Sequence, residues 1–158
     1  MTFETFFDEH YEAVRRSLAV AFGDPVVAEE LAQDAFTRAL SDWRRVAQME
    51  RPAGWVYVVA LRAGRRRGRA SAVPPTRPES ATPDIADAVT SGVALGDAIG
   101  RLPERQRIAL VLRYLADLPV ADVALAMDCA VGTVKSTLHA ALERLGVEMR
   151  EEEPDAAR

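Results

Sequence analysis

Four prolines fall within one segment of fourteen residues, SAVPPTRPESATPD at 71–84, and no aromatic side chain accompanies them. Proline lacks the backbone N–H that a continuing helix needs, and so few apolar side chains cannot offset the entropy lost on ordering. We therefore expect a flexible linker here, between lobes at 1–70 and 85–150, with an acidic tail at 151–158. Each lobe would bury only about 60% of its unfolded surface, so each should gain from packing against a partner.

Apolar residues recur at helical intervals along the first lobe. We expect helices at 3–22, at about 25–47 and from Pro52 onward. Asp24 and Pro25 supply a capping acid and a first-turn proline for the second of these helices. The centre of the third, WVYVVAL, is rich in strand-forming residues, but we assign it to a helix because a lone strand has nothing to pair with.

The second lobe is expected to hold four helices. The first spans about 84–102 and the second begins at Pro103. The third runs from Pro119 to Met127, and the fourth runs from about Thr133 to Val147. The helix that begins at Pro103 would bury Ile108, Val111, Leu112 and Leu115. The predicted fold class is therefore all-α, with two small helical lobes joined by a flexible Pro-rich linker.

Residue usage argues against several classes of function. One cysteine, Cys129, and two histidines leave no disulfide framework and no His/Cys metal site. The sequence has no glycine-rich phosphate loop and no Ser/His/Asp or Cys/His set, so we expect no enzyme activity, no cofactor and no small-molecule substrate. The longest apolar run, Trp55–Leu61, is far below the ~18 residues that span a bilayer, and the acidic N-terminus is unlike a signal peptide. We expect a cytoplasmic protein with no membrane partner.

Charge is segregated along the chain. The formal net charge is −4, yet residues 61–70 (LRAGRRRGRA) hold five arginines and no acid. Binding to a polyanion follows the local field, so this block makes nucleic-acid contact plausible. The alternative, that the arginines only solvate one helix end, stays open on charge alone.

Residues 120–138 fit a helix-turn-helix. Ala124 is the small residue that a tight helix crossing needs, and Asp128 stands in the turn, where a residue tolerant of positive φ is required. In the last helix, one face carries Val134, Leu138, Leu142 and Leu145, which should pack inward. The outward face carries Lys135, Ser136 and His139, as a groove-reading helix requires, and Thr133 can cap that helix. An ordinary helical hairpin is the alternative, because two helices joined by a three-residue turn are common. The outward face also has few cations for DNA.

Longer motifs resemble the extracytoplasmic-function (ECF) sigma factors of bacterial RNA polymerase. LPERQRIALVLRYL and LPVADVALAMDCAVGTVKSTLHAALERL are similar to the fourth conserved region of that family. FFDEHYEAVRRSL and GDPVVAEELAQDAFTRAL are similar to its second region. The resemblance implies a promoter-specificity subunit whose partners are core RNA polymerase and promoter DNA, and an anti-sigma factor is a further candidate partner. A helix-turn-helix regulator, or a sigma-like protein that does not support initiation, is the alternative.

The resemblance also implies roles for individual residues. Those expected on core polymerase are Glu30, Leu31, Gln33, Asp34 and Phe36, although an acidic solvated face over a Leu/Phe core would look alike. Segment 42–56 is expected at the minus-ten element, and the residues expected on DNA in the first lobe are Arg44, Arg45, Arg62, Arg65, Arg66 and Arg69. Those expected at the minus-thirty-five element are Thr133, Lys135, Ser136 and His139. This chain departs from the family at Thr137 and Ala140, where two arginines are usual, so upstream phosphate contacts should be fewer.

Overall fold

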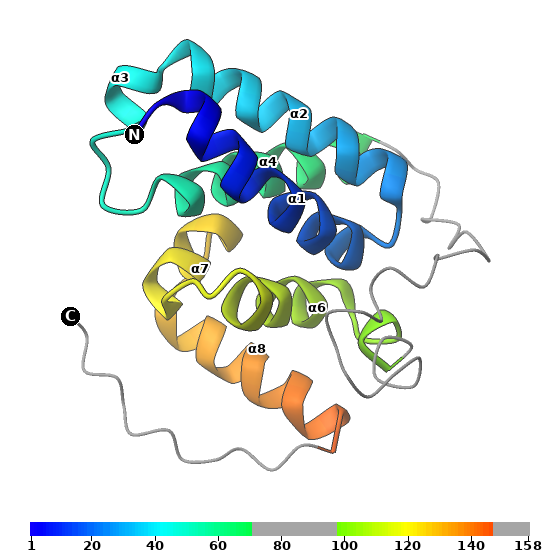
Figure 1. Cartoon of the computed structure of the whole chain (residues 1–158). Coiled ribbons are helices and arrows are strands. Elements are labelled where there is room, and N and C mark those ends of the chain that lie inside the picture. Colours follow the sequence, from blue (N-terminus) through cyan, green and yellow to red (C-terminus); the bar gives the residue numbers. More distant parts are fainter. Residues whose placement is uncertain (71–97, 147–158) are drawn as a thin grey trace.

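The computed structural model describes residues 1–70 and 98–146 of the chain (Figure 1). All regular structure in these two ranges is helical, which confirms the all-α prediction. The elements are α1 (Phe3–Phe22), α2 (Pro25–Ser41), α3 (Trp43–Val46), α4 (Pro52–Ala70), α6 (Glu104–Leu110), the π-helical turn η2 (Val111–Leu115), α7 (Val120–Met127) and α8 (Val131–Arg144). The expected linker, the acidic tail and most of the helix expected at 84–102 lie outside the described residues.

The junction between α1 and α2 follows the local sequence signals. Gly23 ends α1 in the left-handed conformation, with φ at 68°. Asp24 then caps α2, because its carboxylate accepts hydrogen bonds from the backbone N–H groups of Val26 and Val27, and Pro25 occupies the first turn.

The second helix is shorter than predicted. The expected helix at 25–47 is interrupted at Asp42, and the single turn α3 follows. This break turns the Trp43 ring back onto the N-terminal aromatic residues, where it lies 5.5 Å from the Phe3 ring and 5.0 Å from the Phe6 ring. Val46 is fully buried by the same turn, so packing onto the core outweighs the continuous helical pattern.

Helix α4 confirms the assignment of WVYVVAL to a helix. Val56, Tyr57 and Leu61 are buried against α1 and α2. Burial raises the pKa of the Tyr57 hydroxyl, and a hydrogen bond with Ser17 at 3.3 Å opposes part of that rise. Gly64 allows α4 to pack closely against α1, since a Cβ at this position would lie 2.4 Å from Cζ of Phe22.

The π-helical turn η2 changes which side chains are buried. The backbone N–H of Ala116 donates to Val111, five residues back, and widens the helix there. Leu115 was expected in the core, but it is 42% exposed because this wider turn shifts it off the buried face.

The helix-turn-helix is present, with one correction. Asp128 ends α7 at a φ of 53°, as the turn requires. Helix α8 begins at Val131, two residues earlier than expected, and Ala130 holds the capping position. Thr133 therefore lies inside the first turn and does not cap the helix.

Helices from the two predicted lobes share one hydrophobic core, a feature that the sequence did not predict. The layer of α1, α2 and α4 lies directly over α6 and α7 (Figure 1). Phe6 and Leu18 of α1 belong to the same buried cluster as Leu112 and Val123, while Leu102, Leu110 and Ala141 form a small second cluster.

Candidate functional site

The basic end of α4 lies against the helix-turn-helix. Nη2 of Arg62 donates to the carbonyl oxygen of Leu125 at 2.9 Å, and Nη1 of Arg65 donates to that of Met127 at 2.7 Å. Both carbonyls are in the last turn of α7, which has few backbone donors and carries a partial negative charge. The Leu125 carbonyl also accepts the backbone N–H of Asp128 at 3.3 Å. Arg62 and Arg65 thus cap α7, and we call this pair of contacts the arginine clasp.

Arg66 is held less firmly than its neighbours. It lines an open hollow together with Arg62, Arg65 and the turn residue Asp128. Within the described residues, Arg66 makes no hydrogen bond or ion pair, and its side chain is exposed. The side chain of Arg69 lies outside what the structure describes. Among the described arginines of α4 that were expected on DNA, Arg66 is therefore the one available to bind a phosphate.

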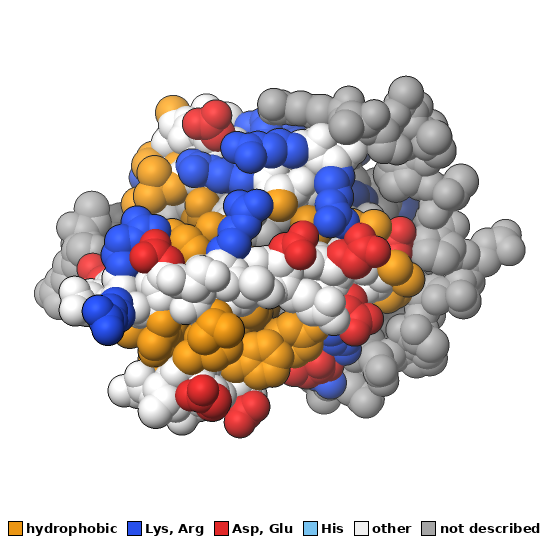
Figure 2. Space-filling model, turned by 90° about the horizontal axis from the view of Figure 1, so that it is seen from above, with side chains coloured by type: hydrophobic (Ala, Val, Ile, Leu, Met, Phe, Trp, Pro, Cys, Tyr) orange, Lys and Arg blue, Asp and Glu red, His pale blue; other side chains and the backbone are white. Residues whose placement is uncertain are grey.

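The exposed face of α2 gathers acids and an amide. Glu30 and Asp34 share Arg67 of α4, whose Nη1 lies 2.6 Å from Oε2 of Glu30 and whose Nη2 lies 3.4 Å from Oδ2 of Asp34. Nε2 of Gln33 donates to Glu29 at 3.4 Å. The space-filling view of the upper layer of helices shows arginines, acids and hydrophobic side chains side by side on one face (Figure 2).

Two of the residues expected on polymerase are not on this face. Leu31 and Phe36 are fully buried in the core, so they support α2 from behind and cannot touch a docked protein. Two residues that the sequence analysis did not place on this face, Val26 and Leu40, are 66% and 53% exposed there. Their positions fall off the buried stripe of α2, and two large apolar side chains there are the signal that was available.

Around α3 the two tryptophans are partly buried and pack against the core. Arg45 donates from Nε to Asp42 at 2.6 Å, and its guanidinium lies 6.0 Å from the ring centroid of Trp55. Arg44 is exposed and, within the described part of the chain, has no ion pair or hydrogen bond.

The outward face of α8 carries the expected residues but few free donors. Thr133, Lys135, Ser136 and His139 are all exposed. The carbonyl of Thr133 accepts the hydroxyl of Ser136 at 3.0 Å and that of Thr137 at 2.7 Å, so both protons are used within the helix. Lys135 is left to supply the positive charge in the middle of this face.

The described ranges contain neither a metal centre nor a membrane-spanning helix. No group of three His, Cys, Asp or Glu residues there has the geometry of a metal centre. None of the helices in residues 1–70 and 98–146 is both long and apolar enough to cross a bilayer.

Comparison with known proteins covers nearly the whole chain. Residues 92–145 match the sequence profile of sigma-70, region 4. The chain is 30% identical to the RNA polymerase sigma-E factor of Streptomyces coelicolor, over 99% of this chain and 90% of that protein. It is 29% identical to the ECF RNA polymerase sigma factor SigL of Mycobacterium tuberculosis H37Rv, over 92% of this chain and 87% of that protein.

The fold is similar to a solved sigma factor as well. The sigma factor RpoE of Bartonella quintana, in complex with the anti-sigma factor NepR, superposes with a TM-score of 0.65 at 22% identity. The match covers 93% of this chain and 98% of that one, so the fold similarity extends over both halves.

Proposed function

The chain belongs to the extracytoplasmic-function sigma factors of bacterial RNA polymerase, and from this premise we propose that the exposed face of α2 binds core polymerase while α4 and α8 bind promoter DNA. The protein functions in transcription initiation by directing the polymerase to promoters, and the polymerase makes the RNA. The observation that carries the proposal is an alignment that includes the α1–α4 half as well as the helix-turn-helix. A simple helix-turn-helix regulator would have no use for the first half.

The docking surface that we propose consists of Glu30, Gln33 and Asp34, with Val26 and Leu40 at its ends. A coiled coil on the polymerase would offer basic and leucine side chains, which match this mixture of acid, amide and apolar groups. Arg67 already pairs with both acids, so the surface is ordered before the polymerase arrives.

The DNA contacts divide between the halves of the chain. We assign the minus-ten element to residues 1–70, with Arg44 and Arg66 on phosphates and the tryptophans of 42–56 near an unstacked base. We assign the minus-thirty-five element to residues 85–150, with Thr133, Lys135, Ser136 and His139 on the outward face of α8. An anti-sigma factor that covers these surfaces would regulate the protein.

Transcription by purified core enzyme tests the function directly. Genomic DNA is transcribed with core enzyme alone and with core plus this protein, and the 5′ ends of the RNA are mapped. We expect a set of 5′ ends that appears only with the protein and shares upstream sequences. If the protein instead binds DNA in a gel shift without core and yields no new 5′ ends, it is a regulator and the proposal is wrong.

Charge reversal tests the docking surface. Asp34→Arg should weaken co-purification with core enzyme more than tenfold, because opposed like charges at an interface cost several kcal/mol. The matched control is Asp8→Arg on α1, an exposed acid without a partner among the described residues. Both variants should keep the helical content of the parent by circular dichroism, since exposed ion pairs contribute about 1 kcal/mol or less. Equal retention of the two variants would contradict the assignment.

A further inference from the structure

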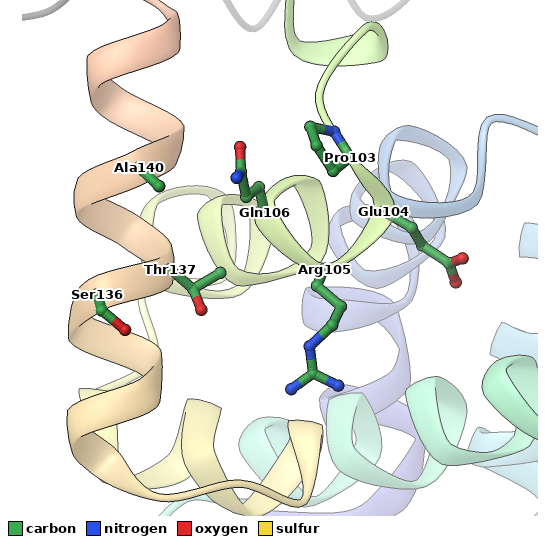
Figure 3. Close-up of a pocket in the computed structure, with 7 residues that line it drawn as sticks. All are labelled: Pro103, Glu104, Arg105, Gln106, Ser136, Thr137 and Ala140. Carbon is green, nitrogen blue, oxygen red and sulfur yellow. The ribbon is translucent and has the colours of Figure 1, made fainter.

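A groove runs between the start of α6 and the flank of α8, next to the outward face of the helix-turn-helix. Its volume is about 490 Å³, and its lining consists of Pro103, Glu104, Arg105, Gln106, Ser136, Thr137 and Ala140 (Figure 3). We call it the α6–α8 groove. None of the contacts assigned so far involves its α6 side.

Arg105 is the cation of this groove. Its side chain lines the groove and extends from α6 roughly parallel to α8, whereas Glu104 points away from α8 (Figure 3). Arg105 is exposed and, among the described residues, makes no hydrogen bond or ion pair. The next arginine along the helix differs, since Nε of Arg107 donates to the carbonyl oxygen of Ala21 at 2.8 Å.

The α8 side of the groove lacks a donor of its own. Thr137 and Ala140 are half-buried and line the groove, and they occupy the two positions at which the family resemblance expects arginine. The hydroxyl of Thr137 donates to Thr133, and alanine has nothing to donate. Any positive charge on this flank of α8 must therefore come from α6.

The dimensions of B-DNA place a phosphate strand at this flank. A helix with its side chains is about 10–12 Å across and the major groove is about 12 Å wide, so a helix seated there has a sugar–phosphate strand along each side. We propose that Arg105 binds a backbone phosphate of the upstream promoter element, with the strand lying along the α6–α8 groove. Arg105 then replaces, from α6, the contacts that arginines at 137 and 140 would make from α8.

This inference rests on the proposed function, and the test uses the complete protein bound to core enzyme on a promoter duplex found by 5′-end mapping. Affinity is measured by fluorescence anisotropy between 50 and 200 mM salt. One phosphate contact contributes about −0.9 to the slope of log affinity against log salt. Arg105→Gln should make the slope shallower by that amount, so over this fourfold salt range the variant loses roughly 3.5-fold less affinity than the parent does.

Two further variants make the test specific. Arg144→Gln removes the same charge from the far end of α8, outside the groove, and should leave the slope unchanged. Arg105→Gln combined with Ala140→Arg moves the cation across the groove and should restore the parental slope. An unchanged slope in Arg105→Gln, or no restoration in the double variant, would overturn the inference. If the parent with core enzyme yields no new 5′ ends, the proposed function itself fails, so the two failures are distinguishable.

Discussion

Two aspartates hold backbone conformations that most side chains avoid. Asp117 has a φ of 52° and Asp128 a φ of 53°, both in the left-handed region. Aspartate tolerates this region because its short polar side chain bonds locally, whereas an alanine there is strained by its Cβ. Asp128 is the more consequential of the two, because it sets the angle between α7 and α8 and lines the hollow beside the arginine clasp.

Substitution at this turn should separate the backbone effect from the charge. Asp128→Gly should raise the free energy of unfolding by up to about 1 kcal/mol, and Asp128→Ala should lower it by about 1 kcal/mol. Asp128→Asn removes the charge but keeps the tolerance of positive φ, so it should stay near the parent. Urea denaturation of the full chain measures all three. An alanine variant as stable as the glycine variant would mean that φ at 128 is not positive.

At the scale of the helices, α4 depends on one glycine for its approach to α1 and α2. A Cβ at Gly64 would lie 2.4 Å from Cζ of Phe22 and 2.9 Å from Cδ1 of Leu31. Leu31 is fully buried and cannot easily move, whereas the partly exposed Phe22 ring can shift. Gly68, one helical turn further on, has nothing within 4 Å of the same constructed atom.

This pair of glycines gives a matched prediction. Gly64→Ala should destabilise the protein by about 1 kcal/mol. This is the low end of the cost of overpacking, because the Phe22 ring can move to make room for the added methyl group. Gly68→Ala should stabilise it by roughly 0.5–1 kcal/mol, because alanine favours the helix and meets no neighbour. Thermal unfolding of both variants provides the measurement, and shifts of the same sign would contradict the packing of α4.

The helices that the sequence predicts well are those with local signals. Asp24 and Pro25 define the start of α2, and the helical spacing of Phe3–Phe22 defines α1, because capping and amphipathic periodicity act within a few residues. The break at Asp42 and the π-helical turn at Val111–Leu115 were missed, because both depend on how side chains pack against distant helices. In the candidate site, the motif that resembles the family does not separate exposed from buried residues, so it includes Leu31 and Phe36, which are buried under the acidic face of α2.

At the scale of the whole molecule, the two halves of the chain contact each other, and the sequence does not predict these contacts. Arg62 bonds a carbonyl 63 positions away, and Arg107 bonds one 86 positions away. A flexible linker and a dense arginine block predict two independent lobes, with the arginines free for DNA. The structure instead uses Arg62 and Arg65 to hold α7, so the assignment of these two residues to DNA requires that the arginine clasp opens first.

The promoter contacts proposed above require the same opening. The minus-ten and minus-thirty-five elements are about 25 base pairs apart, which at 3.4 Å each is about 85 Å. A compact chain of this length is roughly 40 Å across, so the arrangement with one shared core cannot touch both elements at once. On the proposed assignment of residues 1–70 and 85–150 to the two elements, binding to core polymerase separates α4 from α7, and the free energy of docking has to exceed that of the shared core.

Energy transfer between dyes on α2 and α8 should report this opening. The dyes are placed at Ser41→Cys and Glu143→Cys, two exposed positions, with the native cysteine removed by Cys129→Ser. Transfer should be high in the free protein and fall when core enzyme is added, as the dyes move apart by tens of ångströms. Arg62→Gln with Arg65→Gln should lower transfer in the free protein, because the carbonyls of Leu125 and Met127 lose the side-chain hydrogen bonds that join α7 to α4. Arg44→Gln with Arg45→Gln removes the same charge outside the arginine clasp and should leave transfer unchanged. If transfer is the same with and without core enzyme, the two halves do not separate on docking, and the route from the closed protein to a promoter complex proposed above is wrong.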